Sequence, residues 1–369
     1  MAKEPVREDA AEHPRRTPGL VGHSAAQSLL LRRVADGRLA HAWIFSGPRG
    51  IGKATLAYRF ARHLLSRRDS GSEVSLFGEP STQSLEVPAE SSVFRLVAQG
   101  AHPDLITVER AYDEKAKRLR GEISVDDVRR LTPFFGTTAS GEGWRVAIVD
   151  SVDDLNRNAA NALLKILEEP PERGVLILIA HTRGAVLPTI RSRCATLTMA
   201  PLAASEVAAV LQGHVGDLDP QAMAEVVTLA HGSPGRAIEL AQSGGAAVYR
   251  DMVGLLGASP KGLDIAAVHE LADRASHRGN DEQFRVLSDL LVEWLASMIA
   301  AGASGRAFRA IIEGEEGVAE KLWRSRGLAQ WLEVWEKVRD RLVQSEALNL
   351  DRKQTLIDVF LSLDHVSRA

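Results

Sequence analysis

The first half of the chain alternates helical patterns with short, nearly continuous apolar runs. Apolar residues at helical spacing predict helices at residues 25–36, 91–99, 125–135 and 158–169, and another from residue 53 to the polar segment 66–71. The apolar runs predict strands at residues 41–46, 105–108, 145–149 and 175–180. Short apolar strands between helices are typical of a parallel sheet that helices cover on both faces. The pattern therefore predicts an α/β fold for this half.

The second half shows helical patterns only. From Ser205 onward the strand signals stop, and helical spacing at 206–212, 220–230 and 235–242 predicts a small helical unit. A Gly/Ala/Ser-rich stretch near 244–258 marks a boundary, and the rest is helical. A chain of 369 residues exceeds the usual single-core limit of roughly 250–300 residues. We therefore predict a disordered polar tail at 1–18, an α/β domain at 19–200, a small helical domain at 201–245 and a helical domain at 260–369.

Composition limits the function without defining it. The 45 basic and 48 acidic residues give a formal charge of −3, which provides no whole-chain electrostatic argument for nucleic acid or membrane. The one cysteine, Cys194, excludes an intrachain disulfide framework and a cysteine-rich zinc site made by this chain alone, and it fits a reducing cytoplasm. The most apolar helical stretch, 284–301, contains Arg285, Asp289 and Glu293, so we expect a buried helix rather than a membrane span.

A phosphate-binding loop is the first candidate for chemistry. It fits the pattern G-x-x-x-x-G-K-[ST] except at its last position, and it reads Gly47-Pro48-Arg49-Gly50-Ile51-Gly52-Lys53-Ala54. In such loops the glycines let backbone N–H groups surround the phosphates, lysine reaches the outer phosphates, and the hydroxyl binds Mg²⁺. Ala54 cannot bind a metal. Thr55 follows, but the next helical residue points about 100° away, so we do not expect it to substitute. The loop leaves nucleotide binding open and makes nucleotide turnover doubtful.

A strand-end carboxylate is the second candidate. The apolar run Arg145–Asp150 ends in Asp150, where a Walker B aspartate would orient Mg²⁺. On its own such a residue is more often a strand-end or helix-capping aspartate, but the phosphate loop favours the metal-orienting interpretation. The residue after it is Ser151, whose hydroxyl is too weak a base to activate water. Asp153 and Asp154 are alternative bases, although they lie beyond a turn.

An arginine close to Cys194 is the third candidate. It lies in the run Pro188-Thr189-Ile190-Arg191-Ser192-Arg193-Cys194. This run resembles the Ser-Arg-Cys motif of bacterial clamp-loader AAA+ subunits, which carries an arginine finger. By that resemblance Arg193 inserts into the nucleotide site of a neighbouring subunit and neutralises charge on the transferred phosphoryl group. The alternative is an arginine in a structural ion pair.

Other segments resemble the same family, and the likeness covers nearly everything from about residue 20 to the C-terminus. They are Leu20–His23, similar to a segment that brackets the adenine; Asn158–Pro171, similar to a helix near DNA; and Gly232–Arg236, similar to the sensor-2 segment of the lid. The resemblance implies that the small helical domain is a lid and the last domain a collar for oligomerisation. It also implies a site for ATP or ADP made by Gly47, Gly50, Gly52, Lys53, Ala54, Thr55, Asp150 and Arg236.

The resemblance implies a non-hydrolysing subunit of the sliding-clamp loader in the DNA polymerase III holoenzyme. Such a subunit is not catalytic by itself, and polymerase activity belongs to the assembly. Its partners would be the motor (tau/gamma) and delta subunits, the sliding clamp indirectly, and primed DNA within the complex, in the cytoplasm and away from membranes. Many members carry a four-cysteine zinc module after the first helix. Residues 71–92 contain no cysteine, so no zinc is expected.

Two other functions compete with this interpretation. An active AAA+ ATPase, such as the motor subunit of a clamp loader, would share the fold but should have Ser or Thr at position 54 and Glu at position 151. A P-loop nucleoside or nucleotide kinase should have an arginine-rich catalytic lid and no reason for a helical tail of this length. The residues present, Ala54 and Ser151, favour the non-hydrolysing subunit.

Overall fold

The computed structural model describes residues 13–67, 84–113, 118–136, 143–216, 218–259, 262–277, 281–348 and 350–368. The chain forms two compact units. The first comprises Met1–Glu206 together with Gly232–Gly235, and the second comprises Val207–His231 together with Arg236–Ala369. The finer division into a lid at 201–245 and a collar at 260–369 stays a prediction.

The first unit is built on a five-stranded parallel sheet in the order β2-β5-β6-β1-β7. The strands are β1 (Ala42–Ser46), β2 (Leu105–Glu109), β5 (Arg145–Asp150), β6 (Gly174–Ala180) and β7 (Ala195–Thr198). Every residue of β1 and β6 is buried, as expected for central strands covered on both faces. The edge strand β7 was not predicted, because it has only four residues and two of them, Thr196 and Thr198, are polar.

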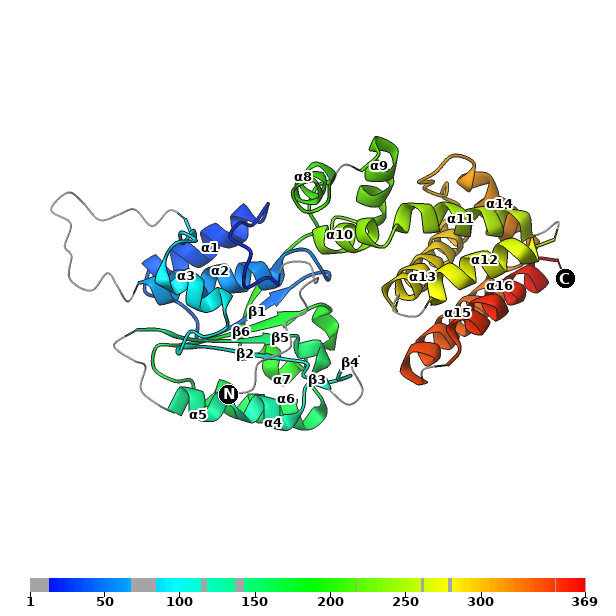
Figure 1. Cartoon of the computed structure of the whole chain (residues 1–369). Helices are drawn as coiled ribbons and strands as arrows, with labels where there is room; N and C mark the ends of the chain where they lie inside the picture. Colours follow the sequence, from blue (N-terminus) through cyan, green and yellow to red (C-terminus); the bar gives the residue numbers. More distant parts are fainter. Residues whose placement is uncertain are drawn as a thin grey trace. The chain divides into compact units, whose positions relative to one another are not determined.

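Helices cover both faces of this sheet, which confirms the predicted α/β class (Figure 1). One layer contains α1 (Ser24–Ala35), α2 (Lys53–Ser66) and α3 (Ser92–Ala98); the other contains α4 (Val125–Arg129), α5 (Leu131–Gly136), α6 (Arg157–Glu168) and α7 (Pro188–Arg191). The short elements are η1 (Val152–Asp154), η2 (Arg183–Ala185) and the hairpin β3 (Tyr112–Asp113) with β4 (Arg118–Leu119). The helix predicted at 125–135 is divided between α4 and α5, because Pro133 lacks the N–H that would continue it.

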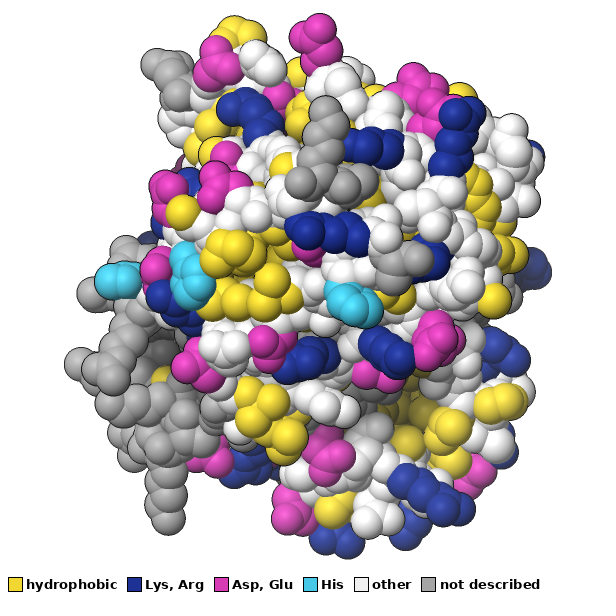
Figure 2. All heavy atoms as spheres, turned by 90° about the vertical axis from the view of Figure 1, so that its right-hand side faces the viewer, with side chains coloured by type: hydrophobic (Ala, Val, Ile, Leu, Met, Phe, Trp, Pro, Cys, Tyr) yellow, Lys and Arg dark blue, Asp and Glu magenta, His cyan; other side chains and the backbone are white. Residues whose placement is uncertain are grey.

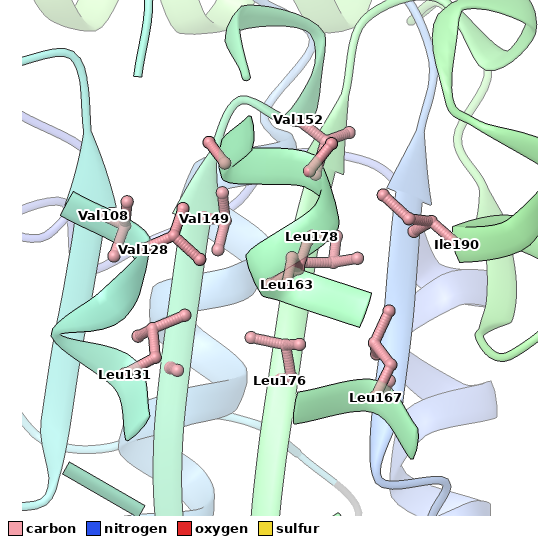
Figure 3. Packing of buried hydrophobic residues seen from close by; sticks show 14 of the residues in the cluster. Val108, Val128, Leu131, Val149, Val152, Leu163, Leu167, Leu176, Leu178 and Ile190 are labelled. Atoms are coloured by element: carbon pink, nitrogen blue, oxygen red, sulfur yellow. The ribbon is translucent and has the colours of Figure 1, made fainter. Parts of the chain in front are cut away.

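The core beneath α4 and α6 joins these helices to the sheet. Figure 3 shows apolar side chains of three strands meeting those of α4, α5, α6 and α7, among them Val108, Val128, Leu131, Val149, Leu163, Leu167, Leu176, Leu178 and Ile190. On α6, Leu163 and Leu167 lie one turn apart and are buried, and Leu164 is partly buried against the same core, so the helix has an apolar side. Asn161, Lys165 and Glu168 are exposed, so the polar side of α6 faces solvent in this chain.

Part of the predicted tail is ordered against α2. Arg59 and Arg62 are buried, and their guanidinium groups donate to backbone carbonyls of the segment 13–18. Arg62 donates to Thr17 O at 2.8 Å and to Arg15 O at 3.1 Å, and Arg59 donates to Pro18 O. The prediction of disorder therefore does not hold for residues 13–18, while residues 1–12 lie outside the described part of the chain.

The second unit contains helices and no strand among its described residues. Its helices are α8 (Ala204–His214, which begins in the first unit), α9 (Pro220–Leu229), α10 (Pro234–Gln242, which likewise begins in the first unit), α11 (Gly245–Ala258), α12 (Ile265–Ser276), α13 (Asp281–Ser304), α14 (Glu315–Ser325), α15 (Leu328–Leu348) and α16 (Arg352–Arg368). By length and composition α13 could cross a membrane, but half of its most apolar window is buried within the protein. Its buried Leu287, Leu291 and Trp294 are those of a core helix.

The surface charge fits the near-neutral composition. Figure 2 shows one face of the molecule, on which Lys and Arg side chains are interspersed with Asp and Glu. Opposite charges that alternate in this way do not sum to a strong field over that face. The view therefore offers no broad electrostatic surface for nucleic acid.

A buried carboxylate organises the second unit. Glu315, at the start of α14, is fully buried and accepts four hydrogen bonds. Its Oε1 accepts from the Tyr249 hydroxyl and from Trp294 Nε1 at 2.8 Å. Its Oε2 accepts from the backbone N–H groups of Ile311 and Ile312 at 2.6 and 3.0 Å. One carboxylate therefore joins α11, α13 and the loop that precedes α14.

We expect Glu315→Ala to lower the free energy of unfolding of the second unit by about 2–4 kcal/mol, because it leaves buried donors without an acceptor. Urea denaturation of the whole chain measures this loss. The matched control is Glu316→Ala, because Glu316 is exposed and should change stability by less than about 0.5 kcal/mol. Equal losses for the two variants would contradict the role given to Glu315.

Candidate nucleotide site and arginine finger

The candidate nucleotide site is the phosphate loop, residues 47–53, which connects β1 to α2. A side chain at Gly47 is excluded, because its Cβ would lie 2.3 Å from the Met199 carbonyl oxygen. The Gly47 N–H donates to Ala180 O of β6 at 3.3 Å. The loop therefore leaves the sheet in close contact with the segments that follow β6 and β7.

Lys53 folds over the start of the loop. Its Nζ donates to the carbonyl oxygens of Gly47 at 2.6 Å and Pro48 at 2.5 Å, and the side chain is buried. Burial lowers the pKa of Lys53 to about 8, and the attraction of Asp150 and Asp153 offsets part of that shift. The ammonium group thus lies at the loop, close to these two carboxylates, as the motif predicts.

The next two carbonyls are held by the turn before α10. Ser233 Oγ donates to Arg49 O at 2.8 Å, and the Gly235 N–H donates to Gly50 O at 2.9 Å. A Cβ at position 235 would lie 3.0 Å from Gly50 Cα, a tight contact, so glycine favours this close approach. Residues 232–235 belong to the first unit, and they fix the middle of the loop.

His23 completes the set of donors. Its Nε2 lies 2.7 Å from Ile51 O, and because a carbonyl can only accept, this nitrogen carries the proton. Five successive carbonyls, from residue 47 to residue 51, are therefore each bound by a donor. These contacts hold the backbone of the loop in one conformation.

Asp150 lies where the sequence predicts, at the end of β5. It is in register with Glu109 at the end of β2. Burial raises the pKa of Asp150 to about 6, with Glu109 adding to the rise and Lys53 opposing it. Ala54 and Thr55 lie in the first turn of α2 and are half-buried. The residues fit the phosphates of a nucleotide, but the position that supplies a hydroxyl to the metal is filled by Ala54.

The side chains after β5 that could act as a base already take part in hydrogen bonds within the protein. Ser151 is buried and its Oγ donates to Asp154 Oδ2 at 3.1 Å. Both carboxylate oxygens of Asp153 accept backbone N–H groups, from His181 at 2.7 Å and from Thr182 at 2.9 Å. These contacts hold the segment that follows β6, so Asp153 and Asp154 act as structural acceptors here.

Arg193 follows α7 and is paired with α6. Its Nη2 donates to Glu168 Oε1 at 2.8 Å and its Nη1 donates to Thr189 O at 3.0 Å. The side chains of Arg193 and Glu168 are 37% and 52% exposed, so the guanidinium is accessible from solvent. The neighbouring Cys194 is half-buried, and burial raises its pKa to about 12, which keeps the thiol protonated.

Arg236 belongs to the second unit. Its guanidinium makes two parallel bonds to the carboxylate of Glu293 on α13, one of them from Nη2 to Oε2 at 2.5 Å. The predicted contact between Arg236 and a nucleotide therefore remains a prediction. Sequence reasoning also missed the acceptor roles of Glu168 and Glu293.

The segments Leu20–His23 and Gly232–Arg236 were recognised in the sequence. Their pattern did not indicate that His23 and Ser233 donate hydrogen bonds to carbonyls of the phosphate loop. No local pattern marks these donors. Within the described residues, no group of three or more His, Cys, Asp or Glu is arranged to hold a metal ion. The absence of zinc stays a prediction, and the cysteine-free segment lies outside the described residues up to residue 83.

The first unit combines a parallel sheet with a phosphate loop after a central strand, a strand-end aspartate and an exposed arginine in a Ser-Arg-Cys run. These features together define an AAA+ module of the clamp-loader type. Residues 22–203 match the family model described as DNA polymerase III, delta subunit. Over these residues, about half of its length, the chain is a clamp-loader module of the DNA polymerase III delta-prime type.

The chain is similar to several DNA polymerase III subunits. The chain is 36% identical to a DNA polymerase III subunit delta′ of Pseudomonas aeruginosa over 53% of this chain and 54% of that protein. It is 31% identical to the subunit delta′ of Escherichia coli over 56% of each chain. A gamma subunit-related protein from Thermotoga maritima aligns with 93% of this chain and all of its own at a TM-score of 0.44 and 15% identity. The chain thus spans about half the length of the curated relatives it matches.

Because Lys53 is buried, the free energy of unfolding depends on pH in the alkaline range. Its folded pKa of about 8 lies below the ordinary value of 10.5, so the folded state loses this proton first and the wild type gains stability as pH rises between these values. The gain is at most about 3 kcal/mol. The Lys53→Met variant lacks this titrating group. Relative to the variant, the wild type should therefore gain about 1–3 kcal/mol of unfolding free energy between pH 7.5 and 10.

Urea denaturation at a series of pH values measures the effect. Lys165→Met, at an exposed lysine of α6, is the control and should follow the wild-type curve. If the Lys53→Met and wild-type curves run parallel across this range, Lys53 does not have a lowered pKa in the folded chain.

Proposed function

We propose that this chain is a non-hydrolysing stator subunit of the sliding-clamp loader, and that it supplies Arg193 to the nucleotide site of the neighbouring motor ATPase. The observation that carries the proposal is an exposed Ser-Arg-Cys arginine on a module whose own hydrolytic positions hold Ala54 and Ser151. Removing the metal-binding hydroxyl and the water-activating carboxylate disables a site while leaving the finger intact.

Three contacts argue against turnover at this chain's own loop. Ser151 donates its hydroxyl to Asp154, so it is not available to a water molecule, and a serine hydroxyl is a weak base in any case. Both carboxylate oxygens of Asp153 accept hydrogen bonds from backbone N–H groups. A water at the phosphate loop therefore lacks a free carboxylate in the position that follows Asp150.

The arginine can leave its partner at low cost. The Arg193–Glu168 pair is exposed on both sides, and exposed ion pairs contribute about 0–1 kcal/mol. Arginine offers five donors in a planar fork, which suits a phosphoryl group that gains charge on its oxygens. In the complex, turnover by the motor would then require the stator to be correctly placed beside it.

The proposed partners follow the family. They are the motor (tau/gamma) and delta subunits, the sliding clamp indirectly, and primed DNA within the assembled ring, in the cytoplasm. The chain is also similar to a tau subunit of Escherichia coli, at 32% identity over 49% of this chain, so the proposed stator and motor have related sequences. The helical second unit would form the collar that joins the ring. The alternative of an active motor shares the fold, but Ala54 and Ser151 count against it.

We expect Arg193→Ala to leave folding and assembly intact and to abolish DNA-stimulated ATPase at the adjacent motor site. A missing arginine finger costs about 10³–10⁵ in rate in the GTPase systems where it is measured. The measurement is ATPase of the reconstituted complex with clamp and primed DNA. The control is Arg191→Ala, at the exposed last residue of α7, which should keep full activity. A completely assembled Arg193→Ala ring with wild-type turnover would exclude the finger.

Neutralising Glu168 should raise the ATPase activity of the complex, whereas Arg193→Ala should lower it. Glu168→Gln removes the charge that competes for the Arg193 guanidinium, so basal ATPase of the complex should rise, by no more than about fivefold because the pair is exposed. Glu169→Gln, at the exposed carboxylate next in sequence, is the control. A fall in activity for Glu168→Gln alone would mean that Glu168 orients the arginine instead of competing for it.

A further inference from the structure

We propose that a groove between α6 and α7 binds an extended, acidic segment of a protein partner that carries an apolar side chain. The groove lies in the first unit and has a volume of about 410 Å³. None of its lining residues belongs to the phosphate loop, and the pair of Arg193 and Glu168 lies at the other end of α6. The proposed binding therefore does not depend on the role given to Arg193.

The walls of the groove are mainly apolar. The buried residues that line it include Val152, Ala160, Val186 and Ile190, and two of them, Val152 and Ile190, are labelled in Figure 3. Leu187, which directly precedes α7, lines the same groove and is 41% exposed. An apolar side chain that enters the groove leaves water and covers Leu187, which is the main favourable term in protein association. A groove of this volume lies in the size range of ligand pockets.

Two polar side chains of α6 also line the groove. Arg157 and Asn161 lie one turn apart, and both are exposed. Neither side chain has a hydrogen-bond or ion-pair partner within the described part of the chain. Asp153 is the acid among the lining residues, but both of its carboxylate oxygens accept backbone N–H groups. The groove therefore offers a guanidinium and an amide to a ligand, and its own carboxylate is occupied.

The start of α6 adds to the preference for an anion. Asn156 caps the helix, and its side chain accepts from the Ala159 N–H at 2.9 Å. The N–H groups of Arg157 and Asn158 donate to no acceptor among the described residues. Unpaired N–H groups and the helix dipole give this end of a helix a partial positive charge. Arg157 and the helix end thus attract the same carboxylate.

These features favour a protein segment over a nucleic acid. A phosphate backbone is bound by several cations, whereas Arg157 is the one cation among the described residues that line the groove. Apolar walls offer nothing to a phosphate, but they suit a leucine or phenylalanine side chain. A segment that carries such a side chain between carboxylates matches both the walls and the charge, and such complementarity gives specificity.

The test is fluorescence anisotropy of the full chain with two labelled peptides. The acidic probe is Asp-Asp-Leu-Phe-Asp-Asp, and the basic probe has Lys in place of each Asp. We expect the wild type to bind the acidic probe at least about fivefold more tightly than the basic one. Arg157→Glu should reverse this preference, whereas Arg95→Glu, at an exposed arginine of α3, should keep it.

The apolar wall has its own variant. Leu187→Ser should weaken binding of the acidic probe by about fivefold or more, whereas Leu361→Ser, at a leucine of α16 that is also 41% exposed, should leave it unchanged. On the wild type, the acidic probe should slow amide hydrogen exchange in segments 155–161 and 185–190. This measurement decides the question even if a variant does not fold.

Three results would overturn the proposal. They are equal or absent binding of the two probes by the wild type, unchanged hydrogen exchange in both segments, and equal affinities of Leu187→Ser and Leu361→Ser for the acidic probe. Displacement of the acidic probe by a thymidine oligonucleotide, with Arg157→Glu abolishing oligonucleotide binding, would assign the groove to nucleic acid and would also overturn it. None of these results affects the ATPase test of Arg193.

Discussion

The geometry of the first unit depends on one requirement of the backbone: a loop that turns its N–H groups inward must find donors for the carbonyls it turns outward. Here the carbonyls of residues 47–51 are bound by side chains and backbone of the protein itself. Buried carbonyls without partners would be costly, so these contacts hold the loop in one shape. Residues as distant as His23 and Ser233 are in this sense part of the loop.

The same site shows how stability and binding compete. Lys53 is a buried cation whose charged form burial disfavours, although nearby carboxylates offset part of the effect. Asp150 is disfavoured as an anion for the same reason, and Glu109 beside it adds to the effect. Without a bound phosphate, the folded chain therefore keeps close together two groups whose charged forms are disfavoured by burial. Charges in this state are common where a ligand of opposite sign completes the site, and they are harder to explain as purely structural groups.

The sequence was enough to predict the parts of the structure that repeat locally. The central strands and the apolar stripe of α6 follow from periodicity, and the replacement of the hydroxyl by Ala54 is visible in the motif itself. Edge strand β7 was missed because an edge needs only one apolar face. The donors of the loop were missed for a stronger reason. His23 reaches Ile51 across 28 positions and Ser233 reaches Arg49 across 184, and no local pattern encodes contacts at such separations.

The way the loop is held also bears on how such a subunit can arise. None of the groups that bind carbonyls 47–51 is a metal ligand or a catalytic base, and neither Ala54 nor Ser151 is among them. The residues that shape the loop and the residues that would hydrolyse a nucleotide are therefore separate sets. A gene could lose the second set by drift without damage to the first, so an ancestor with ATPase activity would yield a silent but well-folded copy in a few substitutions. Threonine at position 54 would disturb none of the contacts that hold the loop, whereas a larger side chain at position 151 would have to fit where Ser151 is buried and donates to Asp154.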